Sequence, residues 1–174
     1  MEAFSTRRIV CIGLTTAIYV VLTTALPEIS YNAVQFRIAE ALMLFCLLDK
    51  DFVTATTLGC FIANLLSPVG VVDVIAGTSA TLLSGLCIYI MRDKLNPITA
   101  SVFPVVFNAI FVGTELYFTA DTPLEFGVMS VAAGEIVCVT ILGTIFYKAV
   151  TANKAFVKVL TDNTAERQPP DKKV

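Results

Sequence analysis

The sequence predicts an all-α integral membrane protein with six transmembrane helices, and three observations lead to that prediction. Hydrophobic residues make up 56% of the chain and charged residues only 15%, whereas a soluble domain averages about 25% charged residues. The mean hydropathy is +0.81. Finally, apolar runs alternate with short polar loops, and the loops alternate between those that carry Lys or Arg and those that carry neither. A mostly lipid-embedded chain accounts for all three.

Each predicted helix is an apolar run bounded by polar or turn-forming residues. A spanning helix needs about 20 residues, and the second and third runs are shorter than that. We expect these two helices either to include flanking residues or to end inside the membrane, where protein or a water-filled cavity provides hydrogen-bond partners for the backbone. The six runs are Ile9–Leu26, Val34–Leu48, Phe52–Leu66, Val71–Met91, Ile98–Phe118 and Leu124–Tyr147.

The basic residues orient the predicted bundle. Of the twelve Lys and Arg residues, all except Arg37 fall on one side if the helices number six. Because Lys and Arg concentrate in cytoplasmic loops, that side is predicted to be cytoplasmic, and both termini with it. The basic residues on the predicted inner side are Arg7, Arg8, Lys50, Arg92, Lys94, Lys148, Lys154, Lys158, Arg167, Lys172 and Lys173.

The chain is predicted to divide at residue 148. Residues 1–148 form one transmembrane domain in the cell membrane that carries the binding site, and residues 149–174 form a polar cytoplasmic tail. The first apolar run is longer than the h-region of a signal peptide, so we expect it to be retained. Residues 155–160 are expected to form a short interfacial helix, and residues 161–174, with Pro169 and Pro170, to be disordered.

Several kinds of chemistry lack their usual residues. The chain has no His, and its five cysteines include no CxxC pair, so neither a metal site nor a disulfide framework is predicted. No glycine-rich phosphate-binding loop of the P-loop type is present. We therefore expect no cofactor, no metal, no catalytic residues and no ATP hydrolysis by this chain.

Polar residues inside the apolar runs are the candidate ligand-binding residues. A charge in the middle of a bilayer costs at least about 2.5–3.5 kcal/mol, so such groups face the bundle interior, pair with one another or meet a ligand. With the predicted topology they all lie in the outer half or near the midplane, which favours a site open to the outside over a through-channel. The candidates are Gln35, Arg37, Glu40, Asn64, Asp73, Asn108, Glu115 and Glu135.

Spacing and charge add detail to this site. Arg37 and Glu40 are three residues apart and are predicted to pair on one helix face, while Asn108 and Glu115, seven apart, share a face. The acids outnumber the single Arg, so a ligand rich in hydrogen-bond donors or carrying positive charge is favoured. The alternative is structural: an Arg–Glu ion pair, helix-bridging amides and a Glu115 that reaches toward water.

A stripe of small residues marks the first run. Gly13 and Ala17 are four residues apart, with Val21 and Ala25 continuing the stripe. Small residues at this spacing allow close approach of another helix backbone. Spacing alone favours docking of a partner and packing within the chain equally.

Several short segments resemble one family. They are Gln35–Leu42, Gly59–Leu65, Asp73–Thr78, Asn108–Ala109, Gly113–Leu116 and Gly134–Glu135. In this order, over about residues 9 to 148, they are similar to the QueT family, the queuosine-precursor substrate-binding (S) component of energy-coupling factor (ECF) transporters.

The resemblance implies a six-helix S-component bundle that captures its substrate outside. Partners would be an ECF coupling protein, docked on the Gly13–Ala17 stripe, and two ATPase subunits. The implied ligand is a 7-deazaguanine: the aminomethyl precursor, the nitrile precursor or queuine. A carboxylate, expected to be Glu115 or Glu135, would accept from its N–H edge, and a second carboxylate would meet a cationic arm.

Three other functions are compatible with the residues. One is an S-component for another small nutrient, and the second is a stand-alone secondary transporter or channel-like carrier, which would work without ATPases. The third is a polytopic membrane enzyme that uses the carboxylates as acid and base. The absence of His and of nucleophile or metal motifs disfavours the enzyme.

Overall fold

The computed structural model describes residues 6–30 and 36–161. Within these ranges the chain is helical, with turns and no strand. Of the sequence predictions, Gln35 and the polar segment after Thr161 lie outside the described residues. The elements are α1 (Thr6–Thr24), α2 (Pro27–Ser30), η1 (Ile38–Leu47), α3 (Lys50–Leu65), α4 (Val71–Met91), α5 (Pro97–Ala100), α6 (Val102–Thr119), α7 (Leu124–Glu135), η2 (Ile136–Gly143), α8 (Thr144–Thr151) and α9 (Lys154–Thr161).

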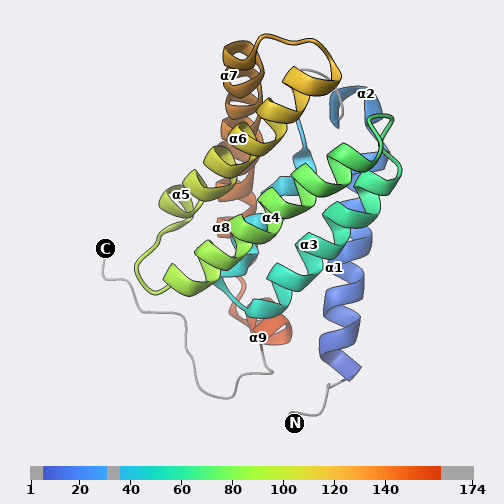
Figure 1. Ribbon diagram of the computed structural model, residues 1–174. Coiled ribbons are helices and arrows are strands. Elements are labelled where there is room, and N and C mark those ends of the chain that lie inside the picture. Colours follow the sequence, from blue (N-terminus) through green and yellow to red (C-terminus); the bar gives the residue numbers. More distant parts are fainter. Residues whose placement is uncertain (1–5, 31–35, 162–174) are drawn as a thin grey trace.

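The long helices pack side by side, each on the next, around one central segment. α1 packs on α3, α3 on α4, α4 on α6, and α6 on α7 (Figure 1). The central segment is η1, which contacts α1, α3, α4 and η2. Its residues are apolar on every side except for Glu40, and positions 39–46 are buried, as expected for a helix that is hydrophobic all round.

Three helical stretches are long and apolar enough to cross a membrane: Val71–Met91, Pro97–Thr119 and Leu124–Thr151. The predicted fourth run has the same bounds as α4, and the sixth extends four residues beyond its predicted end. Shorter apolar helices cover Arg8–Thr24 and Ile38–Leu47, and α3 has 16 residues. The described residues are therefore all-helical, as is typical of a membrane protein, and a total of six spans stays a prediction.

Two segments depart from α-helical geometry, and they pack on each other. η1 is a 3-10 helix of 10 residues, which at about 2.0 Å rise per residue is about 20 Å long, compared with about 15 Å for an α-helix. This geometry lengthens a run that is short for a span. η2 is a π-helix of 8 residues in the middle of the last long stretch. A Cβ on Gly143 would lie 3.2 Å from the Cα of Ala41, so the glycine permits their close approach.

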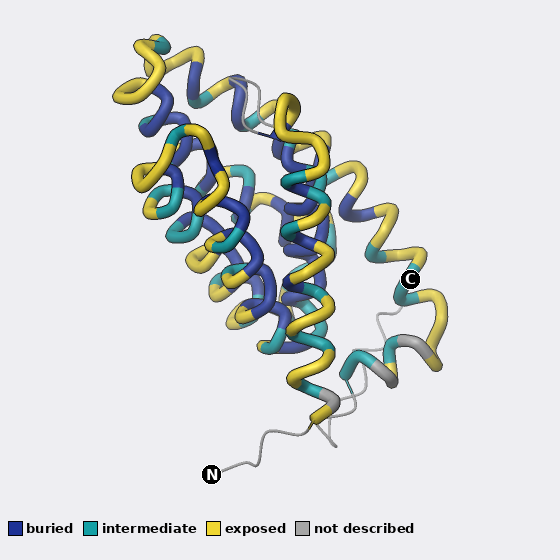
Figure 2. The backbone as a smooth tube through the Cα atoms, turned by 90° about the vertical axis from the view of Figure 1, so that its right-hand side faces the viewer, coloured by how far each residue is buried: buried dark blue, intermediate teal, exposed yellow. Residues whose placement is uncertain are grey.

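The long helices around η1 each have a buried side and an exposed side, which Figure 2 shows as alternating colours along the tube. Large apolar side chains are exposed on the outside, including Ile90 at 73% and Phe118 at 75%. Such a surface is typical of contact with lipid. The loops expected on the inner side, after η1 and after α4, lie at the same end as α9 in Figure 1, and the α3–α4 and α6–α7 connections lie at the other.

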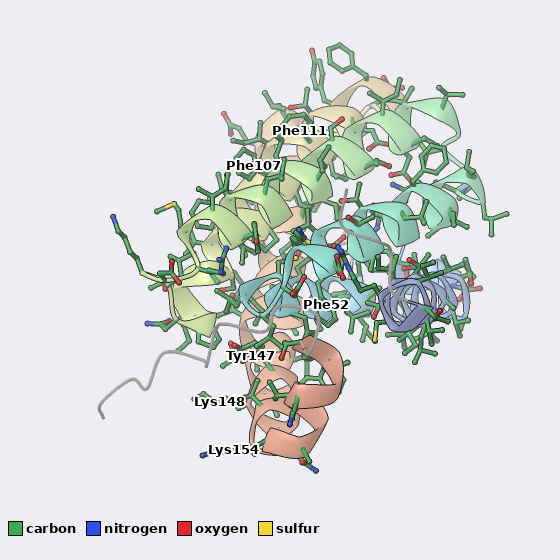
Figure 3. The ribbon with its side chains drawn as sticks, turned by 90° about the horizontal axis from the view of Figure 1, so that it is seen from below. Phe52, Phe107, Phe111, Tyr147, Lys148 and Lys154 are labelled. Carbon is green, nitrogen blue, oxygen red and sulfur yellow. The ribbon has the colours of Figure 1, made fainter. Side chains whose placement is uncertain are left out.

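An aromatic cluster fills the end that holds α9. The ring of Phe45 lies 5.5 Å from those of Phe52 and Phe146 and 5.8 Å from that of Tyr147. Figure 3, seen from this end, labels Phe52 and Tyr147, with Lys148 and Lys154 following on α8 and α9. This packing makes the end that holds α9 apolar and leaves the polar interior toward the opposite end.

Candidate functional site: a buried cluster of acceptors

The polar residues predicted inside the apolar runs are buried in the bundle. All those within the described residues are at most 3% exposed: Arg37, Glu40, Asn64, Asp73, Asn108, Glu115 and Glu135. They come from η1, α3, α4, α6 and α7, so the fold brings together residues almost 100 positions apart. Arg37 immediately precedes η1, and Glu135 is the last residue of α7 before η2. Two of them thus stand where the helical hydrogen-bonding pattern changes, a frequent feature of functional sites.

Arg37, Asn64 and Asp73 form one group, called here the ion-pair cluster. The Nη2 of Arg37 donates to Asn64 Oδ1 at 3.0 Å and to Asp73 Oδ1 at 3.0 Å. Asn64 Nδ2 in turn donates to the Asp73 carbonyl at 3.0 Å. Gly77 makes space for the cluster, because a Cβ there would lie only 2.5 Å from Asn64 Nδ2. Charge and hydrogen bonds are matched within this cluster, as buried ion pairs require.

The ion-pair cluster corrects one prediction. Arg37 pairs with Asp73 on α4, not with Glu40, as the i,i+3 spacing suggests. The reason is local: Arg37 has non-helical backbone angles, φ −83° and ψ 87°, so the helical face that would bring residues three apart together does not include it. Asn108 and Glu115, by contrast, are both buried on α6 as predicted.

Glu40, Asn108 and Glu135 form a second group, called here the acceptor cluster. Asn108 Nδ2 donates to Glu135 Oε1 at 3.0 Å. The Oε1 of Glu40 accepts from the Tyr19 hydroxyl and, at 3.4 Å, from the Thr81 hydroxyl. The carboxyl groups of Glu40 and Glu135 are close enough to interact electrostatically, and Asn108 also lies within reach of Glu40. Elements η1, α6 and α7 thus direct three polar side chains at one another.

The acceptor cluster is not internally matched. Glu40 Oε2, Asn108 Oδ1 and Glu135 Oε2 are buried and have no hydrogen-bond partner among the described residues. The Oε2 of Glu115 is in the same state, and its carboxyl group interacts electrostatically with Asp73 and Arg37. Leaving a buried acceptor unmatched costs about 1–3 kcal/mol, and more for a charged group. With the carboxyl groups ionised, all four atoms are acceptors, so the partners that they lack are donors.

Aromatic rings near the site differ in exposure. Phe61, Tyr117 and Phe118 are exposed, and the last two line a surface groove of about 410 Å³ at the α6–α7 connection with Asp121, Thr122 and Pro123. No residue of either cluster lines that groove. Phe107 and Phe111, labelled on α6 in Figure 3, are half-buried, and Phe111 lies three residues after Asn108, on the same side of the helix.

Sequence reasoning missed two hydroxyl donors, Tyr19 and Thr81. Both are fully buried. A signal for Tyr19 was present: Thr16, Tyr19 and Thr23 recur at helical spacing on α1, on the side away from Gly13 and Ala17. An aromatic residue in an apolar helix is ordinarily a packing residue, so this pattern alone does not indicate a polar role. Among the described residues, no group of three or more His, Cys, Asp or Glu residues could hold a metal ion.

The small-residue stripe on α1 faces outward. Gly13, Ala17, Val21 and Ala25 are all exposed, and a Cβ added at Gly13 would meet nothing within 4 Å. The stripe therefore does not serve packing among the described residues, which was one of its two interpretations. It is free to contact lipid or another protein.

The comparisons with known proteins agree on one family. The model of the QueT transporter family matches residues 9–152. The queuosine precursor transporter QueT of Lactococcus lactis subsp. cremoris (strain MG1363) is 33% identical over 149 residues, which cover 78% of this chain and 87% of the relative. No solved structure matches the chain. The family match includes every member of the two clusters.

Proposed function

Since the chain belongs to the QueT transporter family, we propose that it is a membrane transport protein that binds a queuosine precursor in the acceptor cluster. The observation that supports this most directly is the set of buried acceptor oxygens without partners, on Glu40, Asn108, Glu115 and Glu135. A ligand with several N–H donors would supply what these atoms lack.

The chemistry of a 7-deazaguanine suits this set. Its ring N–H and exocyclic amine present adjacent donors, which one carboxylate can accept together. We assign this edge to Glu135 and Asn108, because they are already joined by a hydrogen bond. A protonated amine on the side arm, present in the aminomethyl precursor and in queuine, would then be met by Glu40 or Glu115. The nitrile precursor has no such charge.

Uptake is proposed to depend on partner subunits. The sequence has no P-loop, and the small-residue stripe on α1 is exposed, as a surface for a close helix–helix contact would be. We therefore infer an ECF-type S-component that docks through Gly13 and Ala17 on a coupling protein, with two ATPase subunits supplying the energy. The alternative, a secondary transporter working alone, would accumulate ligand in vesicles that contain this chain without partners.

The proposed orientation places the end that holds α9, and both termini, in the cytoplasm. It rests on the excess of Lys and Arg in the loops at that end. Labelling of cysteines introduced at Asp93 and Asp121 in intact cells tests it. Position 121 should react with an impermeant reagent and position 93 should not; reaction at both from outside would overturn the orientation.

Calorimetric titration of the purified protein tests the ligand. We expect the aminomethyl precursor and queuine to bind about 10- to 100-fold more tightly than the nitrile precursor, since a hydrogen bond to a charged group contributes about 1.5–3 kcal/mol. 7-Deazaguanine, the same ring without the arm, is the control and should bind more weakly than the aminomethyl form. No binding of any deazaguanine would overturn the proposed function.

A further inference from the structure

Tyr19 connects the outward-facing helix α1 to the acceptor cluster. Its side chain is fully buried, and its hydroxyl donates to Glu40 Oε1. Of the described polar side chains on the buried side of α1, Thr16 and Thr23 bond only to backbone carbonyls, of Ala55 at 3.1 Å and of Tyr19 at 3.0 Å. Tyr19 is therefore the α1 side chain whose hydrogen bond reaches a carboxylate of the proposed site.

The tyrosine ring has little room to move independently of α1. A Cβ on Gly59 of α3 would lie 2.7 Å from Tyr19 Cβ and 2.8 Å from Cγ. The base of the ring is thus pressed against the α3 backbone, and only a glycine at position 59 allows this approach. Because buried packing of this kind is close to solid-like, a displacement of Glu40 is passed to α1 rather than absorbed by a rotation of Tyr19.

The hydrogen bond also determines which oxygen of Glu40 is available. Tyr19 and Thr81 both donate to Oε1, and Oε2 is buried without a partner. A hydroxyl donating to a carboxylate is among the stronger hydrogen bonds in proteins and restricts the acceptor's rotation. The carboxylate is in this way held through Oε1, and Oε2 is the oxygen left for a ligand.

We propose that Tyr19 is a positioning residue: it holds Glu40 in the orientation that receives the ligand, and it links ligand occupancy to the position of α1. This inference rests on the proposed function, because it needs a ligand at the acceptor cluster. The two opposite faces of α1 have different roles in this proposal. The exposed face carries the stripe with Gly13 and Ala17, and the buried face carries Tyr19. Coupling between the two faces is reciprocal, so a partner that displaces α1 weakens ligand binding through the same hydrogen bond.

The variant Tyr19→Phe removes the hydroxyl and keeps the ring in its place against Gly59. We expect it to lower the affinity for the aminomethyl precursor about tenfold or more in calorimetry, because the orientation of Glu40 is lost. Thr16→Val is the matched control, since it removes another interhelical hydrogen bond of α1 that does not involve Glu40. It should bind within about twofold of the wild type.

A double-mutant cycle with Glu40→Gln separates positioning from a general structural role. If Tyr19 acts through Glu40, adding Tyr19→Phe to Glu40→Gln should change affinity less than about threefold. An equal tenfold loss in both backgrounds, or wild-type affinity of Tyr19→Phe, would overturn the role of Tyr19. Failure of the wild-type protein to bind any deazaguanine would instead overturn the proposed function, and the role of Tyr19 with it.

Discussion

The ion-pair cluster and the acceptor cluster each contain one amide and one or two acidic residues, and both are buried, but only the first also contains a cation. They differ in how completely their hydrogen-bonding groups are matched. In the first, Arg37, Asn64 and Asp73 supply donors and acceptors to one another. In the second, Glu40, Asn108 and Glu135 keep buried oxygens without partners. Burial of the polar residues therefore does not separate the two clusters, whereas the balance of donors and acceptors does, and our proposal of a binding role rests on that balance.

The largest expected effect is on stability, at the ion-pair cluster. Asp73→Asn keeps the side-chain shape but leaves Arg37 without its counter-charge in a buried position. Breaking a buried pair from one side costs about 3–5 kcal/mol, so the thermal unfolding midpoint in detergent should fall sharply. Asp93→Asn, in an exposed loop, is the control and should change stability by less than about 0.5 kcal/mol.

If Asp73→Asn instead kept wild-type stability and lost ligand binding, the ion-pair cluster would belong to the binding site. That result would remove the distinction between the two clusters. It would also favour an anionic group on the ligand, for which Arg37 is the only buried cation among the described residues.

A smaller effect is expected from Gly77→Ala. The added Cβ would lie 2.5 Å from Asn64 Nδ2 and 3.2 Å from Arg37 Nη1, and Asn64 Nδ2 is held in place by its hydrogen bond to Asp73. Such overpacking costs about 1–3 kcal/mol, which chemical or thermal unfolding would measure. Gly13→Ala, where the same atom meets nothing within 4 Å, is the matched control. Unchanged stability of Gly77→Ala would show that the cluster is looser than its hydrogen bonds suggest.

The smallest effect on stability and on ligand affinity is expected outside both clusters. Gly13→Leu adds a bulky side chain to the exposed stripe of α1, so the unfolding midpoint and the affinity should stay at wild-type values. Assembly with the coupling protein and uptake by whole cells should be lost, because the stripe no longer allows close approach. Normal assembly and uptake by this variant would show that the stripe faces only lipid.

The sequence was sufficient to predict the long apolar helices and the burial of those candidate polar residues that the structure describes, because apolar length and the cost of charge in lipid are properties of the chain itself. It did not reveal that Val34–Leu48 would contain a 3-10 helix, since an apolar run has the same composition in either geometry. That geometry begins after Arg37, and the partner of Arg37 was mispredicted for this reason.

The division into two clusters could not be predicted from the sequence either. It depends on which side chains meet across α3, α4, α6 and α7, and the spacing along one helix carries no information about that. The proposed role of Tyr19 could not be predicted for the same reason, because it follows from a contact with Glu40 on another element. Its helical spacing with Thr16 and Thr23 was visible, but the acceptor that gives the pattern meaning was not.

The most direct test of the central claim is a calorimetric titration of Glu135→Gln with the aminomethyl precursor, beside the wild type. Gln keeps the size of the side chain and replaces one acceptor oxygen by a donor, which cannot receive the N–H edge of the ring. If the acceptor cluster is the binding site, the variant should lose about 2–5 kcal/mol of binding free energy, roughly 30-fold or more in affinity. The unfolding midpoint of the ligand-free protein should be unchanged or raised. Wild-type affinity in a correctly folded variant would contradict the acceptor cluster as the binding site.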